Sequence, residues 1–256
     1  MPFELTEDER YLSAHISDLI ALSLRSGVPR FSAFLNEREA AIAAETARAE
    51  GAIPVFFGGY EGASRTVCGF FESTYGEDFA GDAKNGLFPI RAVSFAFRER
   101  DKLSHRDFLG AIMSLGIKRG TVGDIVVNKG GGAVFCLETE ADLILGITKI
   151  GNVGVCAEDK LTVPIEKPEP VRFTASVPSM RLDCIVGACT NASRDKSASL
   201  VKSGLVSADF SVCLEVSKTV SENSVLSIRG YGKFKVSKIV GVSKKGRIRV
   251  EIEKYV

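Results

Sequence analysis

Basic and hydroxyl side chains are concentrated between residues 193 and 202, in a pattern suited to holding phosphate. Ser193 is a favourable N-cap for a helix that starts at Arg194. A helix N-terminus offers unpaired N–H groups and partial positive charge, so it attracts anions. Lys196 adds charge at the first turn and Ser197 adds a hydroxyl donor, while Lys202 lies two turns beyond Arg194. We therefore predict a phosphate-binding ridge along this helix.

Further basic clusters follow towards the C-terminus. Arginine can hold a phosphate through two parallel hydrogen bonds, whereas lysine acts as a point charge. The alternative is that these residues only solvate a strand surface, but small domains usually mix both signs of charge. The predicted phosphate-binding residues are Arg181, Ser193, Arg194, Lys196, Ser197, Lys202, Arg229, Lys233, Lys235, Lys244, Lys245 and Arg247, with Arg249 beside the last cluster.

The net charge divides unevenly along the chain. Residues 1–170 hold 18 Lys and Arg against 25 Asp and Glu, whereas residues 171–256 hold 15 against 7, giving −7 and +8. This asymmetry favours nucleic acid or another anionic surface as the partner of the basic end. No apolar run approaches the roughly 20 residues of a membrane helix, and the acidic start is unlike a signal peptide. We expect a cytoplasmic protein without membrane attachment.

The residues that could serve catalysis do not form a recognisable active site. Adjacent His105, Arg106 and Asp107 would point in different directions on a helix, so they cannot act as a triad. The glycines at 130–132 lie between two strand-like runs, which indicates a hairpin turn rather than a cofactor loop. Asp183, in Arg-Leu-Asp, resembles a pseudouridine synthase motif but opens the basic segment, so we expect a structural role. We predict no catalytic residue and no cofactor.

The cysteines and histidines lack the spacing of a metal site. No pair of cysteines is spaced C-x-x-C, and both histidines lie far from every cysteine in the sequence. Several of the cysteines lie in apolar runs, where cysteine behaves as a small buried residue. We expect no metal and six reduced thiols, at Cys68, Cys136, Cys156, Cys184, Cys189 and Cys213.

The periodicity of the first 165 residues predicts two α+β domains. In domain 1–75, a helix ends at Gly27, and a second helix starts at Asn36, with Glu39 completing a capping box, and stops at Gly51. Strands 53–57 and 66–71 follow. In domain 85–165, the order β-α-β-β-α-β over 90–157 indicates a ferredoxin-like, RRM-like unit. Its inner strand offers a single aromatic residue, Phe135, so we do not expect base stacking of the RRM kind.

The remaining segment predicts a third domain, 180–256, in which two short helices precede several strands. Four prolines between residues 164 and 180 indicate an extended connector before it. The fold class is therefore α+β, with a helical and α+β N-terminal part, an RRM-like middle domain and a C-terminal domain that carries the basic clusters.

The C-terminal residues resemble the alpha-L RNA-binding domain, named after small-subunit ribosomal protein S-four. The resemblance rests on Arg181-Leu182-Asp183, Ser193-Arg194, Leu200-Val201 and Gly204-x-Val206, and on the more specific run from Leu226 to Phe234. Asp209 stands where the pattern usually has Asn, and Asn223 where it usually has Asp. These departures concern turn positions rather than the RNA-binding face.

A wider resemblance covers nearly the whole chain. The runs from Leu103 to Ala111 and from Leu115 to Arg119, with Gly123-Asp124-Ile125 and Gly58-Gly59-Tyr60, look like the bacterial YlmH-type family. This resemblance implies action at the ribosome, in rescue of stalled large subunits that carry peptidyl-tRNA, where an alpha-L domain contacts rRNA and tRNA. It also implies an association with cell division.

We accordingly expect a monomeric, non-catalytic protein that binds structured rRNA, together with tRNA, on the large ribosomal subunit through phosphate and shape contacts. A second RNA patch is predicted at Arg106, Lys118 and Arg119, because basic residues stand at both ends of one predicted helix. Two alternatives remain: an RNA-modifying enzyme, of the pseudouridine synthase or methyltransferase kind, with an unrecognised site in residues 1–165, and a protein-interaction adaptor in cell division.

Overall fold

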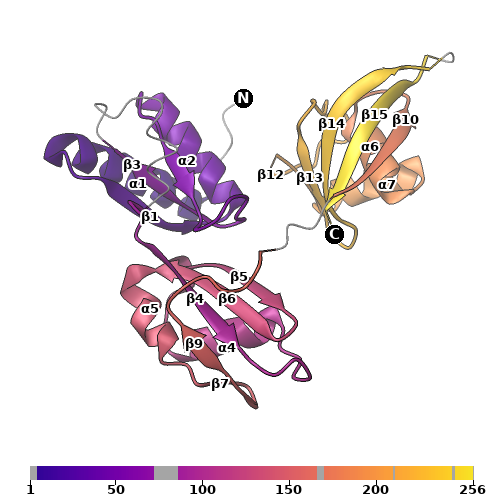
Figure 1. Ribbon diagram of the computed structural model, residues 1–256. Helices are drawn as coiled ribbons and strands as arrows, with labels where there is room; N and C mark the ends of the chain where they lie inside the picture. The colour runs from indigo at the N-terminus through magenta and orange to yellow at the C-terminus, as the bar shows by residue number, and fades with distance from the viewer. Residues whose placement is uncertain (1–4, 72–85, 166–169, 210, 244–245, 256) are drawn as a thin grey trace. The chain divides into compact units, whose positions relative to one another are not determined.

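The computed structural model describes residues 5–71, 86–165, 170–209, 211–243 and 246–255 (Figure 1). The chain divides into two compact units, residues 1–166 and 167–256. Each unit contains helices and antiparallel sheets, which confirms the α+β class. The finer division into domains 1–75, 85–165 and 180–256 stays a prediction.

The first unit begins with two helices on a three-stranded antiparallel sheet of order β1-β3-β2. The end of its first helix at Gly27 and the start of its second helix at Asn36 lie where the sequence predicts. The Asn36 side chain accepts the Glu39 N–H at 3.0 Å, while the Glu39 carboxylate accepts the Asn36 N–H at 2.7 Å, and Gly27 adopts φ +66° at the end of the first helix. The elements are α1 (Glu7–Ser26), β1 (Arg30–Leu35), α2 (Glu37–Ala49), β2 (Val55–Phe57) and β3 (Thr66–Phe70).

A four-stranded antiparallel sheet of order β5-β6-β4-β9 follows in the same unit. The observed element order over residues 90–158 is the β-α-β-β-α-β expected from the sequence, with a short hairpin added before the last strand. The elements are β4 (Ile90–Ala96), α4 (His105–Ser114), the 3-10 turn η1 (Arg119–Thr121), β5 (Val122–Asn128), β6 (Gly131–Leu137), α5 (Glu138–Leu145), β7 (Lys149–Ile150), β8 (Val153–Gly154) and β9 (Cys156–Glu158).

The two sheets of the first unit pack face to face. Helices α4 and α5 cover one face of the four-stranded sheet, where Val93 and Val134 belong to the core. Alternate residues of the same strands, such as Ala133 and Phe135, point the other way and pack against Phe34 of the three-stranded sheet. The unit therefore has four layers, with helices outside and two sheets inside.

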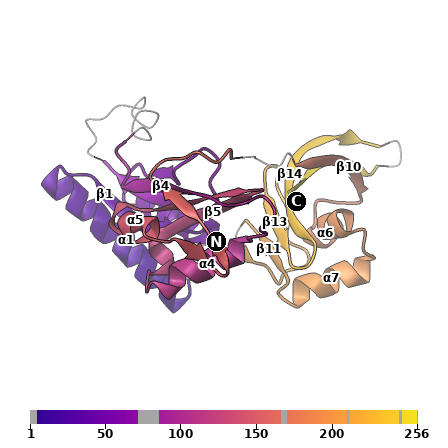
Figure 2. The same cartoon turned by 60° about the horizontal axis from the view of Figure 1, so that its bottom comes forward.

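The second unit has two helices packed on a six-stranded antiparallel sheet of order β10-β15-β14-β13-β11-β12. Figure 2 shows α6 and α7 together on one side of this sheet, where Leu182, Ile185 and Val201 join its core. The elements are β10 (Val171–Val177), α6 (Leu182–Thr190), α7 (Arg194–Lys202), β11 (Val206–Ala208), β12 (Ser211–Val212), β13 (Val225–Ile228), β14 (Gly232–Val242) and β15 (Ile248–Tyr255).

The segment between residues 164 and 180, which the sequence predicts as an extended connector, instead contains strand β10. Residues Val171–Val177 pair with β15 over seven positions, from Val171 opposite Lys254 to Val177 opposite Ile248. The prolines at 168, 170 and 178 flank this strand and do not interrupt it. An edge strand needs ladder partners on one side only, so prolines at its two ends are compatible with the pairing.

All six cysteines are free thiols. Cys68, Cys136 and Cys213 are buried, as expected for core residues, and Cys184 and Cys189 are partly buried. Cys156 differs from the expectation because it is exposed on the short strand β9.

Candidate nucleic-acid interface

A buried carboxylate connects the beginnings of helices α6 and α7. Asp183 is 2 % exposed, and its two oxygens accept the Nε and Nη2 groups of Arg181 at 3.1 and 3.2 Å. The same carboxylate also accepts a hydrogen bond from the Arg194 Nε group at 3.4 Å. It accepts a further one from the backbone N–H of Cys184, the next residue in the chain, at 3.0 Å. Asp183 thus orients Arg181, the N-cap of α6, and Arg194, the first residue of α7.

The electrostatics of this cluster leave positive charge at the surface. Burial raises the pKa of Asp183, but the hydrogen bonds and charge of Arg181 outweigh it, so the pKa lies below its usual value. Two guanidinium groups share this one carboxylate, which leaves one net positive charge. The Arg194 side chain is 72 % exposed, and its single bond to Asp183 goes through Nε. Its Nη groups therefore face solvent and are suited to a phosphate.

The first amide groups of α6 are already used by the protein. The Leu182 N–H donates to the Lys218 carbonyl at 2.8 Å, and the Asp183 N–H donates to the Val216 carbonyl at 3.2 Å. These bonds tie α6 to the 216–220 segment. The N-terminus of α6 is therefore not an anion site, and Arg181 contributes only through its side chain.

Helix α7 starts as the sequence predicts, with Ser193 as its N-cap. The Ser193 side chain accepts the Lys196 N–H at 3.4 Å, so this hydroxyl already has a structural partner. The prediction that the Ser197 hydroxyl contacts RNA is wrong. Its side chain is fully buried and donates to the Ser193 carbonyl at 2.9 Å, so it cannot reach RNA. Position 197 points to the core because Val201, four residues on, occupies the same buried face.

The cations of α7 are exposed, but they do not form one ridge. An α-helix turns about 100° per residue, which places Lys202 about 80° and Lys196 about 160° around the axis from Arg194. All three side chains remain exposed. The prediction of a single ridge is therefore corrected to a broad basic surface along α7, with Arg194 at one end and Lys202 at the other.

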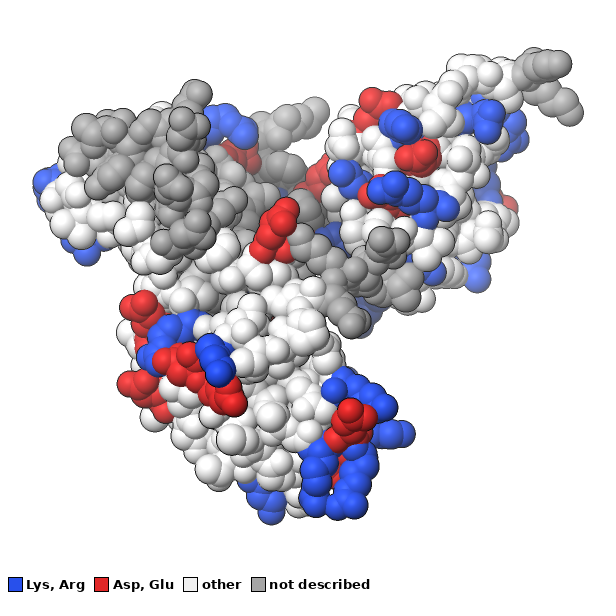
Figure 3. Space-filling model, viewed as in Figure 1, with Lys and Arg blue, Asp and Glu red and all other residues white. Residues whose placement is uncertain are grey.

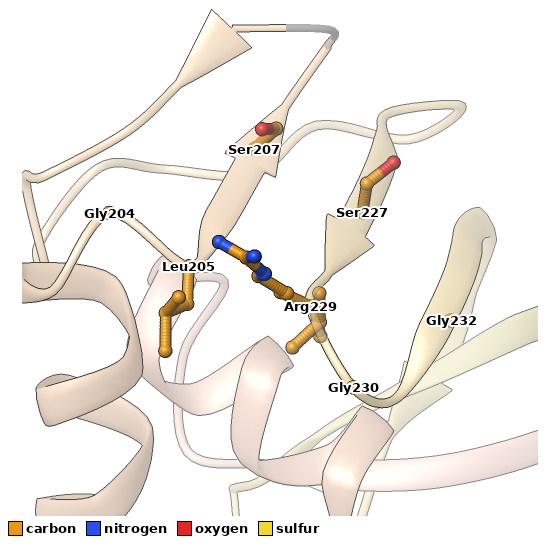
Figure 4. Close-up of a pocket in the computed structure, with 8 residues that line it drawn as sticks. Gly204, Leu205, Ser207, Ser227, Arg229, Gly230 and Gly232 are labelled. Carbon is orange, nitrogen blue, oxygen red and sulfur yellow. The ribbon is translucent and has the colours of Figure 1, made fainter.

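An open groove of about 400 Å³ lies directly after α7 (Figure 4). Its lining includes Gly204 and three residues at the turn between β13 and β14, namely Arg229, Gly230 and Gly232. The Arg229 side chain runs across the groove towards the strand of Ser207. Strand pairing places Ser207 opposite Ser227. A guanidinium and two hydroxyls therefore line one groove, which is a donor set for a phosphate.

The second predicted cluster is brought together by the sheet register. Lys233 lies opposite Ser227, and Lys235 opposite Val225, on the face of the sheet away from the helices. Arg229 precedes them at the same turn. The structure therefore gathers Arg229, Lys233 and Lys235 on one surface, next to the groove.

The third predicted cluster is only partly described. Lys244 and Lys245 lie outside the described residues. Arg247 is exposed, and its Nη2 donates to the Ser176 carbonyl at 2.8 Å, which ties it to β10. Arg249 is exposed on β15, opposite Ser176.

The predicted second patch in the first unit does not come together. Arg119 is partly buried, and its Nη1 donates to the carbonyls of Val122 and Gly123. Burial lowers the pKa of Arg119, as expected for a cation with limited access to water. Arg106 and Lys118 are both exposed, but Arg106 lies in the first turn of α4 and Lys118 lies beyond the other end of this helix, just before η1. Arg119 is therefore corrected from an RNA contact to a brace of the β5 backbone.

The sheet face that an RRM would present to RNA is closed. Phe135 is fully buried, and its ring lies 4.9 Å from the ring of Tyr60, centroid to centroid. The Tyr60 hydroxyl donates to Asp124 at 2.8 Å, and the N–H groups of Ser64 and Arg65 donate to the same carboxylate. This network fixes the 58–65 loop over the sheet. Any RNA contact of residues 88–162 must use another surface.

No group of three or more His, Cys, Asp and Glu side chains is arranged to hold a metal ion in the part of the chain that the structure describes. Within those same residues, every helix is too short or too polar to span a bilayer.

Comparison with known proteins gives consistent relatives. Residues 88–162 match the family model described as "Putative RNA-binding domain in YlmH". The chain is 34 % identical over 230 residues to the ribosome-associated protein quality control protein P2 of Bacillus subtilis, covering 86 % of this chain and 85 % of that protein. The cell division protein ylmH from Streptococcus pneumoniae has a similar fold, with a TM-score of 0.51 and 20 % identity, over 62 % of this chain and 95 % of that one. These matches support an RNA-binding role, and the chain belongs to the YlmH family.

Proposed function

We propose that this protein is a non-catalytic RNA-binding protein that attaches to structured rRNA, and to tRNA held beside it, through its C-terminal unit. The interface consists of the exposed side of α7, from Arg194 to Lys202, and the groove beside Arg229. The match of residues 88–162 to an RNA-binding family model supports RNA as the ligand. The relative from Bacillus subtilis, named for ribosome-associated protein quality control, supports the ribosome as the place of action, and the proposal assigns the protein to stalled large subunits.

The observation that carries this proposal is the exposed Arg194 guanidinium, held at its Nε by the buried carboxylate of Asp183. Holding a long side chain in place reduces the conformational entropy that binding would otherwise cost. The guanidinium can then meet a phosphate through its two Nη groups. A freely moving surface arginine would offer the same charge with less orientation.

Recognition by backbone and shape fits both the ligand and this surface. The deep, narrow major groove of A-form RNA resists side-chain reading, so proteins recognise folded RNA mostly through phosphates and 2′-hydroxyls. The surface along α7 offers guanidinium, ammonium and hydroxyl groups. A neutralisation of about five phosphates would give a log–log slope of affinity against salt of roughly −4.

A binding role without catalysis agrees with the positions of the candidate catalytic groups. Asp183, the residue of the synthase-like motif, is bonded to two arginines and a backbone N–H. His105 is exposed on the first turn of α4. We propose that the protein acts as a monomer in the cytoplasm, where ribosomes work, and needs no cofactor.

The test compares Arg194→Glu with a matched control, Arg172→Glu. Arg172 is also an exposed arginine of the second unit, 68 % exposed, but it lies on β10 and pairs with Glu253 at 3.0 Å. We expect Arg194→Glu to weaken binding to structured RNA at least tenfold, and the control to change it by less than about threefold. Binding is measured by titration of a fluorescent RNA hairpin, with the fold verified by circular dichroism. Equal affinities of the two variants would overturn the assignment.

The ribosomal part of the proposal has its own test. Sucrose-gradient fractionation of a cell extract separates free large subunits from whole ribosomes and soluble protein. We expect the wild-type protein to travel with free large subunits, and Arg194→Glu to shift to the soluble fractions. Wild-type protein in the soluble fractions alone would contradict the proposed partner.

A further inference from the structure

A basic cluster lies at one end of the first unit, where strand β4 leads into helix α4. We define this β4–α4 cluster as Arg98, Arg100, Lys102, Arg106 and Lys129. Strand pairing brings its parts together, because Ala96 at the end of β4 lies opposite Gly131 at the start of β6. The turn that carries Lys129 therefore lies beside the loop that carries Arg98, Arg100 and Lys102.

The loop is anchored at both ends, so it presents its cations from a fixed backbone. Phe97 and Leu103 pack against the core under α4. The Phe97 N–H donates to the Gly130 carbonyl at 3.0 Å, and the Asp101 N–H closes a turn onto the Arg98 carbonyl at 2.8 Å. Four of the five residues between these anchors are exposed, namely Arg98, Glu99, Arg100 and Lys102.

Each acidic residue in this region already has a partner. Glu99 pairs with Lys129 at 3.1 Å, and Asp101 pairs with Arg98 at 3.1 Å. Asp107 accepts the N–H and the hydroxyl of Ser104 at 2.8 and 2.6 Å. These hydrogen bonds hold the pKa of Asp107 below its usual value. The charge of Arg106 lowers this pKa further, whereas desolvation raises it.

Three cations of the cluster have no ion pair among residues 86–165. Arg100, Lys102 and Arg106 are all exposed, and Arg106 meets the Asp107 charge only at longer range. Figure 3 shows basic side chains gathered at the α4 end of this unit and acidic ones near α5. Near α5, Asp142 and Asp159 both pair with Arg91. The unpaired cations of the β4–α4 cluster thus lie in the loop and in the first turn of α4.

We propose that Arg100, Lys102 and Arg106 form a second phosphate-binding surface, whose occupant is the backbone of an RNA strand. This inference rests on the proposed function and names the site that the 88–162 region would use. Two observations carry it: the usual sheet face is closed by Tyr60 and Phe135, and the loop presents unpaired cations on an anchored backbone.

The test uses the full-length protein and an RNA hairpin of about 20 base pairs. One variant, Arg100→Gln/Lys102→Gln/Arg106→Gln, removes three charges from the loop. A matched control, Arg10→Gln/Arg48→Gln/Lys149→Gln, removes three exposed charges elsewhere in the same unit. The three loop side chains are exposed and unpaired, so the fold should tolerate their substitution. We expect the loop variant to bind at least tenfold more weakly near 0.1 M salt, with its salt slope about 2 units shallower than that of the control.

A loop variant with the affinity and slope of the control would overturn this inference. In that case, if Arg194→Glu still weakens RNA binding, the proposed function holds without the second surface. If the wild-type protein does not bind the hairpin, or binds it without salt dependence, the proposed function itself is overturned. Ultraviolet cross-linking followed by peptide mapping gives an independent readout, with RNA expected on the 98–106 peptide, and its absence there would also count against the second surface.

Discussion

The ring of Tyr60 packs on the ring of Phe135, 4.9 Å between centroids, and closes the face of the four-stranded sheet. Phe135 is the aromatic residue on the inner strand that could have stacked on a base. Here it joins the core between two sheets, with Phe34, Val67 and Phe88. The middle region therefore has RRM-like topology but a buried sheet, and its surface chemistry lies in its loops.

Gly59 is required for this closure. Its φ is +97°, and a Cβ atom there would lie 2.3 Å from Cδ1 of Phe135, which is fully buried and has no room to move away. We expect Gly59→Ala to lower the free energy of unfolding of the first unit by about 2–4 kcal/mol, from backbone strain and overpacking together. The measurement is hydrogen exchange at the β6 amides.

Gly51→Ala is the control for Gly59→Ala. Gly51 has φ +70°, but a Cβ atom there meets nothing within 4 Å. Gly51→Ala should therefore lower the free energy of unfolding through backbone strain alone, by about 1 kcal/mol. Similar effects of the two substitutions would show that contact with Phe135 does not matter.

Asp183→Asn tests the carboxylate that holds the two arginines. We expect this substitution to destabilise α6 by about 2 kcal/mol at neutral pH, because charged hydrogen bonds to Arg181 are lost. The pKa of Asp183 is lowered in the folded state. Its contribution is therefore present above the unfolded value, about 3.9, and is lost as the pH falls through the lower folded value.

The difference in stability between wild type and Asp183→Asn should thus be constant above about pH 5 and should shrink as the pH falls below the unfolded value of about 3.9. Hydrogen exchange or denaturant unfolding followed at α6 measures it. Asp195→Asn, at an exposed position in the first turn of α7, is the control and should change stability by about 0.5 kcal/mol or less. A pH-independent difference for Asp183→Asn would argue against a charged carboxylate at this position.

Cysteine reactivity should separate the exposed thiol from the core. Burial raises the pKa of both Cys68 and Cys136 to about 12, so neither forms the reactive thiolate near neutral pH. Cys156 is exposed. We expect iodoacetamide at pH 7.5 to modify Cys156 first, and all six cysteines only after unfolding. Mass spectrometry of peptides reads this out, and rapid labelling of Cys68 in the native protein would contradict the packing.

The sequence by itself determined those features that depend on neighbours in the chain. The Asn36 capping box, the αL end of the first helix at Gly27 and the β-α-β-β-α-β order after residue 90 were all readable, because caps and periodicity act over a few residues. The resemblance to the alpha-L pattern predicts turns at Asp209 and Asn223, and both residues adopt positive φ. The basic character of the last 86 residues required only counting.

Only the tertiary structure decided which side chains are available to a ligand. Strands β1 and β10 escaped prediction because their pairing partners, β3 and β15, lie far along the chain. The burial of Ser197 depends on how α7 rotates onto its sheet, and Arg119 is withdrawn from solvent by carbonyls of the irregular β5 strand. Likewise, the closed face over Phe135 depends on a second sheet that packs against it. Long-range contacts of this kind leave no local pattern, since the residues that make them are separated by tens of positions in the sequence.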